Sequence, residues 1–170
     1  NLPFYKFGDA IYLAKIETKY WIEYICKRFE NTGKHISPEL AEEICRLVDN
    51  HSSYVQQLSW LLWIRTINTA TTEQLSYALE DLLDQNNILF QSETENLSAY
   101  QMNFLKAIVD GIHTKFSSKE VISKYNLGTS ANIVRLKNAL LQKELIETNG
   151  KEIVLADPVF GVWFKKEMLY

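Results

Sequence analysis

The chain has 170 residues, of which 46% are hydrophobic and 12% aromatic, so it can build one ordinary domain or two small ones. Its 18 basic and 21 acidic side chains give a net charge of −3, which argues against a nucleic-acid coat protein and a polybasic membrane binder. The charge is uneven: residues 1–94 carry 8 basic and 13 acidic side chains, net −5, whereas residues 95–170 carry 10 basic and 8 acidic, net +2.

Neither the cysteines nor the apolar runs indicate secretion or a membrane. Cys26 and Cys45 lie within helical patterns and lack metal-site spacing, so we expect reduced, structural thiols. No apolar run approaches the ~20 residues that span a bilayer, and no signal-peptide pattern opens the chain. We therefore expect a cytoplasmic protein without a membrane partner. Because the chain opens with NLPFYKFGD rather than Met, we also expect a fragment of a longer protein.

The first half of the chain predicts four helices. Apolar residues recur at helical spacing in four segments, each with start or stop signals such as Ser37 followed by Pro38, or the Thr71 and Gln74 capping box. The third segment is apolar on several sides, through residues that include Trp60, Trp63 and Ile64, and should form the centre of the unit. The predicted segments are residues 18–33, 37–49, 52–67 and 71–83.

A polar run, Gln91–Asn96, marks the expected boundary between two units, since it has no periodic apolar residues and few contacts should cross it. We expect a helical lid-like bundle over residues 1–92 and a second domain over residues 95–170. The DQNN run at residues 84–87 is expected to end the fourth helix.

The second half has the element order of a winged helix. A Ser98 and Gln101 capping box opens one helix, a short helix ends at Gly128, and Thr129 is expected to cap a longer one. An Asn149-Gly150 pair between two short apolar runs predicts a hairpin with a two-residue type I′ turn. A last amphipathic helix opens at Pro158. The predicted class is mainly α, a four-helix bundle followed by a winged helix-turn-helix domain.

The search for catalytic or metal-binding residues gives no catalytic set and no metal ligands. The sequence has no P-loop, no nucleophile elbow and no zinc-protease motif. His35 and His113 are expected to be solvated loop residues. His51 precedes the third helix, where unpaired backbone N–H groups would favour an anion. On the residues alone, a capping or loop role for His51 remains the simpler interpretation.

Several segments together resemble a known family. FYKFGDAIYLAKI, WIEYICKRFENTGKHIS, NHSSYVQQLSWLLW and LADPVFGVWFKK are similar to the region after the nucleotide-binding core in prokaryotic ATPases of the STAND branch of the AAA+-like P-loop NTPases. The residues from His51 to Gln56 resemble a Gly-His-Pro-Tyr-Tyr-Val-Gln motif of the lid, with Asn50 and Ser52 standing in place of Gly and Pro. The resemblance implies that His51 and Ser52 lie near a bound adenine nucleotide.

Whether the winged helix reads DNA depends on the outward face of its third helix. Helical spacing puts Arg135 and Asn138 on that face, with Asn132 at its edge, and Lys119, Lys124 and Lys151 could contact phosphates. With only one cation on the outward face of that helix and net +2 over the domain, the electrostatic footprint is thin. Packing against the protein's own ATPase core or a protein partner is the favoured alternative to DNA.

The combined expectation is a regulatory lid and winged-helix fragment of a larger ATP-binding protein. The fragment itself should bind no cofactor and hydrolyse no ATP, whereas ATP or ADP with Mg²⁺ should bind an upstream P-loop domain, the expected intramolecular partner. A free-standing winged-helix transcriptional regulator and a protein-interaction adaptor remain open as alternatives.

Overall fold

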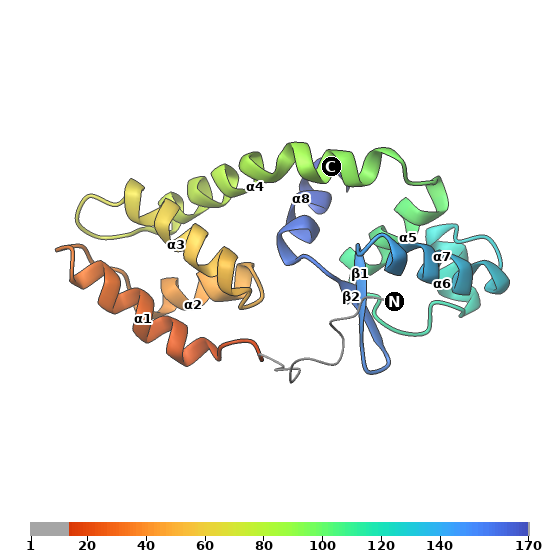
Figure 1. The fold of residues 1–170 in the computed structure, drawn as a ribbon, viewed down its shortest axis with the longest axis horizontal. Helices are drawn as coiled ribbons and strands as arrows, with labels where there is room; N and C mark the ends of the chain where they lie inside the picture. The colour runs from red at the N-terminus through yellow and green to blue at the C-terminus, as the bar shows by residue number, and fades with distance from the viewer. Residues whose placement is uncertain (1–13, 170) are drawn as a thin grey trace, which may run out of the picture.

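A computed structural model describes residues 14–169 and agrees with the predicted class: over these residues the chain is mainly helical, with one antiparallel hairpin (Figure 1). Residues 1–13, which hold most of the first family-like segment, lie outside this description. The elements in chain order are α1 Thr18–Glu30, α2 Pro38–Leu47, α3 Ser52–Arg65, α4 Thr72–Glu95, α5 Ala99–Val109, α6 Lys119–Tyr125, α7 Ser130–Gln142, β1 Ile146–Asn149, β2 Glu152–Leu155 and α8 Pro158–Leu169.

Helices α1 to α4 form the predicted bundle, and their start signals act as expected. The Ser37 side chain accepts a hydrogen bond from the backbone N–H of Leu40, and Thr71 and Gln74 form a complete capping box. Apolar side chains from all four helices fill the interior. The prediction of a buried third helix was wrong for Ile64, because this side chain lies on the outer side of α3 and is 51% exposed. Trp60 lies on the same side and is 57% exposed. The fully buried members include Ile25, Phe29, Ile44, Leu58, Leu62 and Ala78.

The expected linker is instead helical. Helix α4 continues through the DQNN run and through Gln91–Glu95, where the sequence predicted a break and a boundary. Asn86 fits into the helix because its side-chain amide donates to the carbonyl of Leu82 at 2.8 Å. Phe90 and Thr94 are buried, so tertiary packing holds this polar stretch in a helix. The prediction that few contacts would cross the stretch was therefore wrong.

Helices α5 to α8 and the hairpin form the winged helix. Ser98 and Gln101 make the predicted capping box, whereas Thr129 precedes α7 without a side-chain cap. The hairpin pairs Ile146 with Leu155 through Asn149 with Glu152, so its two-residue turn is Gly150-Lys151 rather than Asn149-Gly150. Only Gly150 in this turn has a positive φ, +60°, which fits a type II′ turn and corrects the type I′ prediction.

The two units share one hydrophobic core, because the buried side chains of the lid and of the winged helix form a single cluster. Figure 1 shows α8 lying against α4. The Phe90 ring lies 5.4 Å from Phe160 and 5.6 Å from Trp163, centroid to centroid, and the Trp163 indole donates to Asn87 at 2.8 Å. Helix α4 therefore belongs to both units.

Candidate functional site

The loop before α3 is built on a reversal of the backbone. Asp49 and Asn50 are consecutive residues with positive φ, +48° and +53°, a conformation that Asp and Asn adopt more readily than most side chains. Two backbone hydrogen bonds close the reversal, from Asn50 N–H to the Cys45 carbonyl and from His51 N–H to the Val48 carbonyl, each 2.9 Å. The loop thereby presents His51 at the start of α3.

The structure places His51 at the N-cap of α3, with Ser52 as its first residue, as the sequence suggested. The His51 side chain is exposed and forms no capping hydrogen bond, so the capping role considered from the sequence is absent. Its ring instead packs against Tyr54, with 4.7 Å between centroids. The first turn of α3 therefore has no side-chain acceptor from its N-cap, and its N–H groups are free to donate hydrogen bonds to an external anion.

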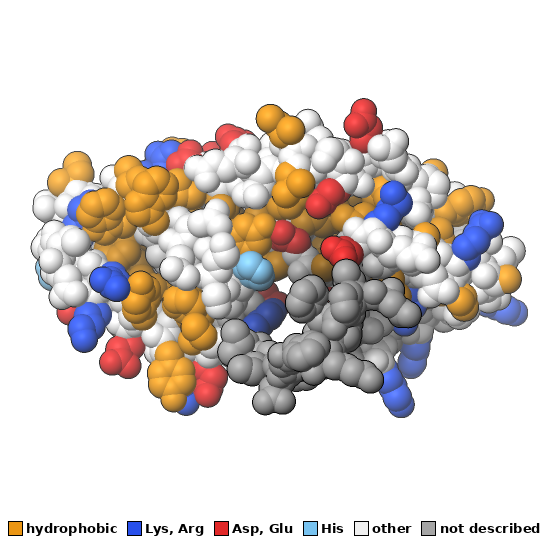
Figure 2. All heavy atoms as spheres, viewed as in Figure 1, with side chains coloured by type: hydrophobic (Ala, Val, Ile, Leu, Met, Phe, Trp, Pro, Cys, Tyr) orange, Lys and Arg blue, Asp and Glu red, His pale blue; other side chains and the backbone are white. Residues whose placement is uncertain are grey.

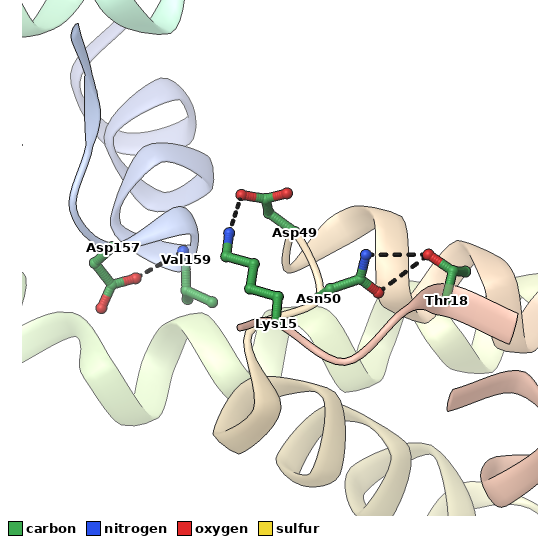
Figure 3. Close-up of polar contacts among 6 residues, drawn as sticks. All are labelled: Lys15, Thr18, Asp49, Asn50, Asp157 and Val159. Carbon is green, nitrogen blue, oxygen red and sulfur yellow. Dashed lines mark hydrogen bonds and ion pairs between the residues drawn. The ribbon is translucent and has the colours of Figure 1, made fainter. Parts of the chain in front are cut away.

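The loop is tied to the segment that precedes α1 (Figure 3). Lys15 pairs with Asp49 at 2.6 Å, and the Asn50 side-chain amide donates to the Thr18 hydroxyl at 3.0 Å. Both members of the ion pair are exposed, so water screens the pair and its contribution to stability is small. The contacts of Asn50 and Thr18 are the better determinant of the loop conformation.

A shallow hollow of about 410 Å³ lies on the Asp49 side of the loop and has one cation, Arg46, among its lining residues. Arg46 is already paired with Glu43, so this side is unsuited to phosphate groups. The hollow is lined by Thr18, Glu39, Glu42, Glu43, Cys45, Arg46, Asp49 and Asn50.

The outward face of α7 carries the residues that the sequence singled out. Arg135 and Asn138 are exposed, whereas Asn132 is half-buried, accepts a 3.4 Å hydrogen bond from the Arg135 guanidinium and lies over Gly128. Val134 is 63% exposed beside them. The face therefore combines one cation with amide and apolar groups.

The three candidate phosphate-binding lysines are all exposed but come from two separate elements. Lys119 and Lys124 belong to α6, and Lys151 belongs to the hairpin turn. The Lys124 ammonium lies 5.0 Å from the centroid of the Tyr125 ring, a cation–π contact. Figure 2 shows Lys and Arg side chains scattered over the visible part of the winged helix rather than gathered in a patch.

The other histidines and the cysteines have structural surroundings. His35 is the exposed loop residue that we expected, and its backbone pairs with Thr69 in an isolated bridge. The prediction was wrong for His113, because its half-buried ring contacts the Ile153 carbonyl at 3.2 Å. Cys26 and Cys45 are free thiols, and burial raises the pKa of Cys45 to about 11, which makes it a poor nucleophile.

Within residues 14–169, no group of three or more His, Cys, Asp or Glu side chains is placed to hold a metal ion. Within the same residues, no helix combines the length and the apolar character needed to cross a membrane.

Sequence reasoning missed the polar contact between Tyr54 and Asp157, which lie 103 residues apart and join the two units. No local pattern links these residues. The Asp157-Pro158 pair did carry a helix-start signal, because Asp favours the N-cap and Pro the first helical position.

Comparison with known proteins supports the fold of both units. A family model described as a probable winged helix domain matches residues 88–166. A solved structure, a Walker-type ATPase of Pyrococcus abyssi, is similar over 89% of this chain with a TM-score of 0.66 and 18% sequence identity. The chain corresponds to 42% of the length of that ATPase. No match was found among curated proteins. The chain thus contains a winged helix domain, and lid and winged helix together share a fold with part of an ATPase.

Proposed function

We propose that this chain is the helical lid and winged-helix part of a longer ATP-binding protein of the STAND type. The lid takes part in nucleotide sensing, and the winged helix makes a regulatory contact with the protein's own nucleotide-binding domain or with a protein partner. The observation that carries the proposal is the likeness to a Walker-type ATPase, which extends over both units of this chain in one superposition.

The geometry of the loop before α3 supports a place for it near the nucleotide. His51 is exposed at a helix N-terminus whose first N–H groups have no side-chain cap, and backbone N–H groups at such a position favour phosphate. In this proposal ATP or ADP with Mg²⁺ is held mainly by a P-loop domain outside residues 1–170. His51 and Ser52 then contribute from the lid.

The proposal is tested on the longer protein. Its coding sequence upstream of Asn1 should contain a Walker A motif, and its product should bind ADP. His51→Ala should weaken ADP binding by about 1–2 kcal/mol, roughly 5- to 30-fold, through the loss of one hydrogen bond to a charged group. His35→Ala is the matched control, because His35 is held by backbone contacts. An ADP affinity that both variants leave unchanged would remove His51 from the site.

A second function, DNA binding by a free-standing winged-helix regulator, is favoured by the exposed Arg135 and Asn138 on α7. Base readout needs such side chains in the major groove, but affinity comes largely from phosphate contacts. Neutralising three phosphates would give a slope of log affinity on log salt of about −2.7, a weak dependence for a specific regulator.

A fluorescence anisotropy titration distinguishes the two functions. We expect the 170-residue chain to bind duplex DNA no more tightly than ~10⁻⁵ M at physiological salt, within the non-specific range. Arg46→Ala, which removes a paired cation of the lid, is the control for Arg135→Ala. Sub-micromolar, sequence-dependent binding that only Arg135→Ala abolishes would establish the DNA-binding function instead.

A further inference from the structure

Two side-chain hydrogen bonds join the lid to the winged helix within residues 14–169. One is the bond from Trp163 to Asn87 described above, and the other is donated by the Tyr54 hydroxyl to Asp157 Oδ2 at 2.6 Å. Tyr54 lies in the first turn of α3 and is 8% exposed, so this bond is largely shielded from water. It connects the start of α3 to the start of α8.

Asp157 uses its two carboxylate oxygens on partners in two different helices. While Oδ2 accepts from Tyr54, Oδ1 accepts from the backbone N–H groups of Val159 at 2.7 Å and Phe160 at 3.0 Å (Figure 3 shows the Val159 bond). Asp157 is therefore the N-cap of α8, and its hydrogen bonds are strengthened by its charge. Burial, and after it Asp157, raises the pKa of Tyr54, so the phenol keeps the proton that it donates.

Besides Asp157, Tyr54 contacts His51 in the exposed loop before α3. The His51 ring packs on the Tyr54 ring, and His51 is exposed at the N-terminus of α3. The contacts are thus continuous from a solvent-exposed loop of the lid, through Tyr54 and Asp157, to the first turn of α8. Helix α8 in turn packs Phe160 and Trp163 on α4.

We propose that Tyr54 and Asp157 are positioning residues that couple the conformation of the loop before α3 to the first turn of α8 in the winged helix. The coupling is a property of this chain, and the identity of its effector, a nucleotide at His51, rests on the proposed function. A displacement of His51 moves Tyr54, and loss of the Tyr54 bond leaves a half-buried carboxylate oxygen without its donor, so α8 must follow or lose stability.

Hydrogen exchange of the 170-residue chain tests the coupling directly. Tyr54→Phe removes only the hydroxyl. It should accelerate exchange of the Val159 and Phe160 amides about tenfold, because Asp157 loses the hydrogen bond from that hydroxyl and caps α8 less firmly. Asp157→Asn should in turn accelerate exchange of the Val55 amide, which donates to the His51 carbonyl at 2.8 Å, since coupling is reciprocal.

Two references separate coupling from general destabilisation. The Leu140 amide in the buried part of α7 reports global opening, and Tyr77→Phe removes an exposed phenol from α4. Acceleration at Val159 and Phe160 that exceeds the change at Leu140, and that Tyr77→Phe does not reproduce, supports the coupling. Equal acceleration at all three amides, or none, overturns it.

A second experiment on the longer protein introduces the effector. At saturating ADP, the wild type should change its exchange at Val159 and Phe160, and Tyr54→Phe should lose that change. A response of α8 that persists in Tyr54→Phe overturns the coupling. If instead ADP affinity is indifferent to His51→Ala, the proposed function fails, while the exchange results from the 170-residue chain still decide the coupling.

Discussion

Replacing Phe90 with Ala should lower the free energy of unfolding of the whole chain by about 3–5 kcal/mol, the range for truncating a buried Phe. The Phe90 side chain is 1% exposed and lies between α4 and α8, in contact with the Phe160 and Trp163 rings. The loss combines removal of apolar area, a cavity and two aromatic pairs. Against a usual total of about 5–15 kcal/mol, it is a large fraction of the stability.

Urea unfolding followed by circular dichroism at 222 nm measures this loss, because the signal reports helices of both units. The matched control is Leu89→Ala, one residue away on α4 and 53% exposed, which should cost about 0.5 kcal/mol or less. Limited proteolysis should also spare Gln91–Asn96 in the wild type and cut there faster in Phe90→Ala. A loss below 1 kcal/mol, or one no larger than that of Leu89→Ala, would refute the shared core.

Three further predictions concern charge, backbone conformation and activity. Burial, and after it Asp157, raises the pKa of Glu93, so the folded chain binds that proton more tightly and loses stability as pH rises through the interval between the unfolded and folded pKa values. Glu93→Gln should therefore raise the urea midpoint at pH 7 but not at pH 3, and the same gain at both pH values would contradict this. Gly128→Ala should cost about 1–2 kcal/mol for its φ of +83°, and Gly111→Ala, with a φ of +92°, should cost about the same, because the atom nearest a Cβ at position 128, Asn132 Nδ2, ends a side chain that can move. No measurable loss in urea unfolding for Gly128→Ala would contradict this. The 170-residue chain should show no ATP turnover above blank in a phosphate-release assay, and turnover that co-purifies with the chain would count against the proposed function.

The features that local chemistry determines could be predicted from the sequence. The Ser37 cap and the two capping boxes, at Thr71 and Ser98, depend on residues three positions apart, so the pattern identifies them directly. The continuation of α4 could not be predicted in this way. It depends on Phe90 packing on side chains of α8, about 70 residues further along the chain, which overrides the polar composition.

In the candidate site too, the sequence predicts what depends on neighbouring residues and misses what depends on tertiary packing. The sequence singled out His51 because it precedes an apolar helix, and the structure confirms this place at the N-cap of α3. The bond between its neighbour Tyr54 and Asp157 could not be predicted, because it depends on how the two units pack. The predicted hairpin turn, Asn149-Gly150, was one residue too early, because both it and the observed turn, Gly150-Lys151, put Gly150 at a central position.

The central claim, that the loop before α3 faces a bound nucleotide, is tested most directly by hydrogen exchange of the longer protein with and without ADP. The amides of Ser52, Ser53 and Tyr54 lack a side-chain cap from His51, so they should exchange rapidly without ligand and be protected when phosphate groups bind them. These three amides should be protected at saturating ADP. Protection confined to an upstream P-loop domain, with exchange at Ser52, Ser53 and Tyr54 unchanged, would contradict it.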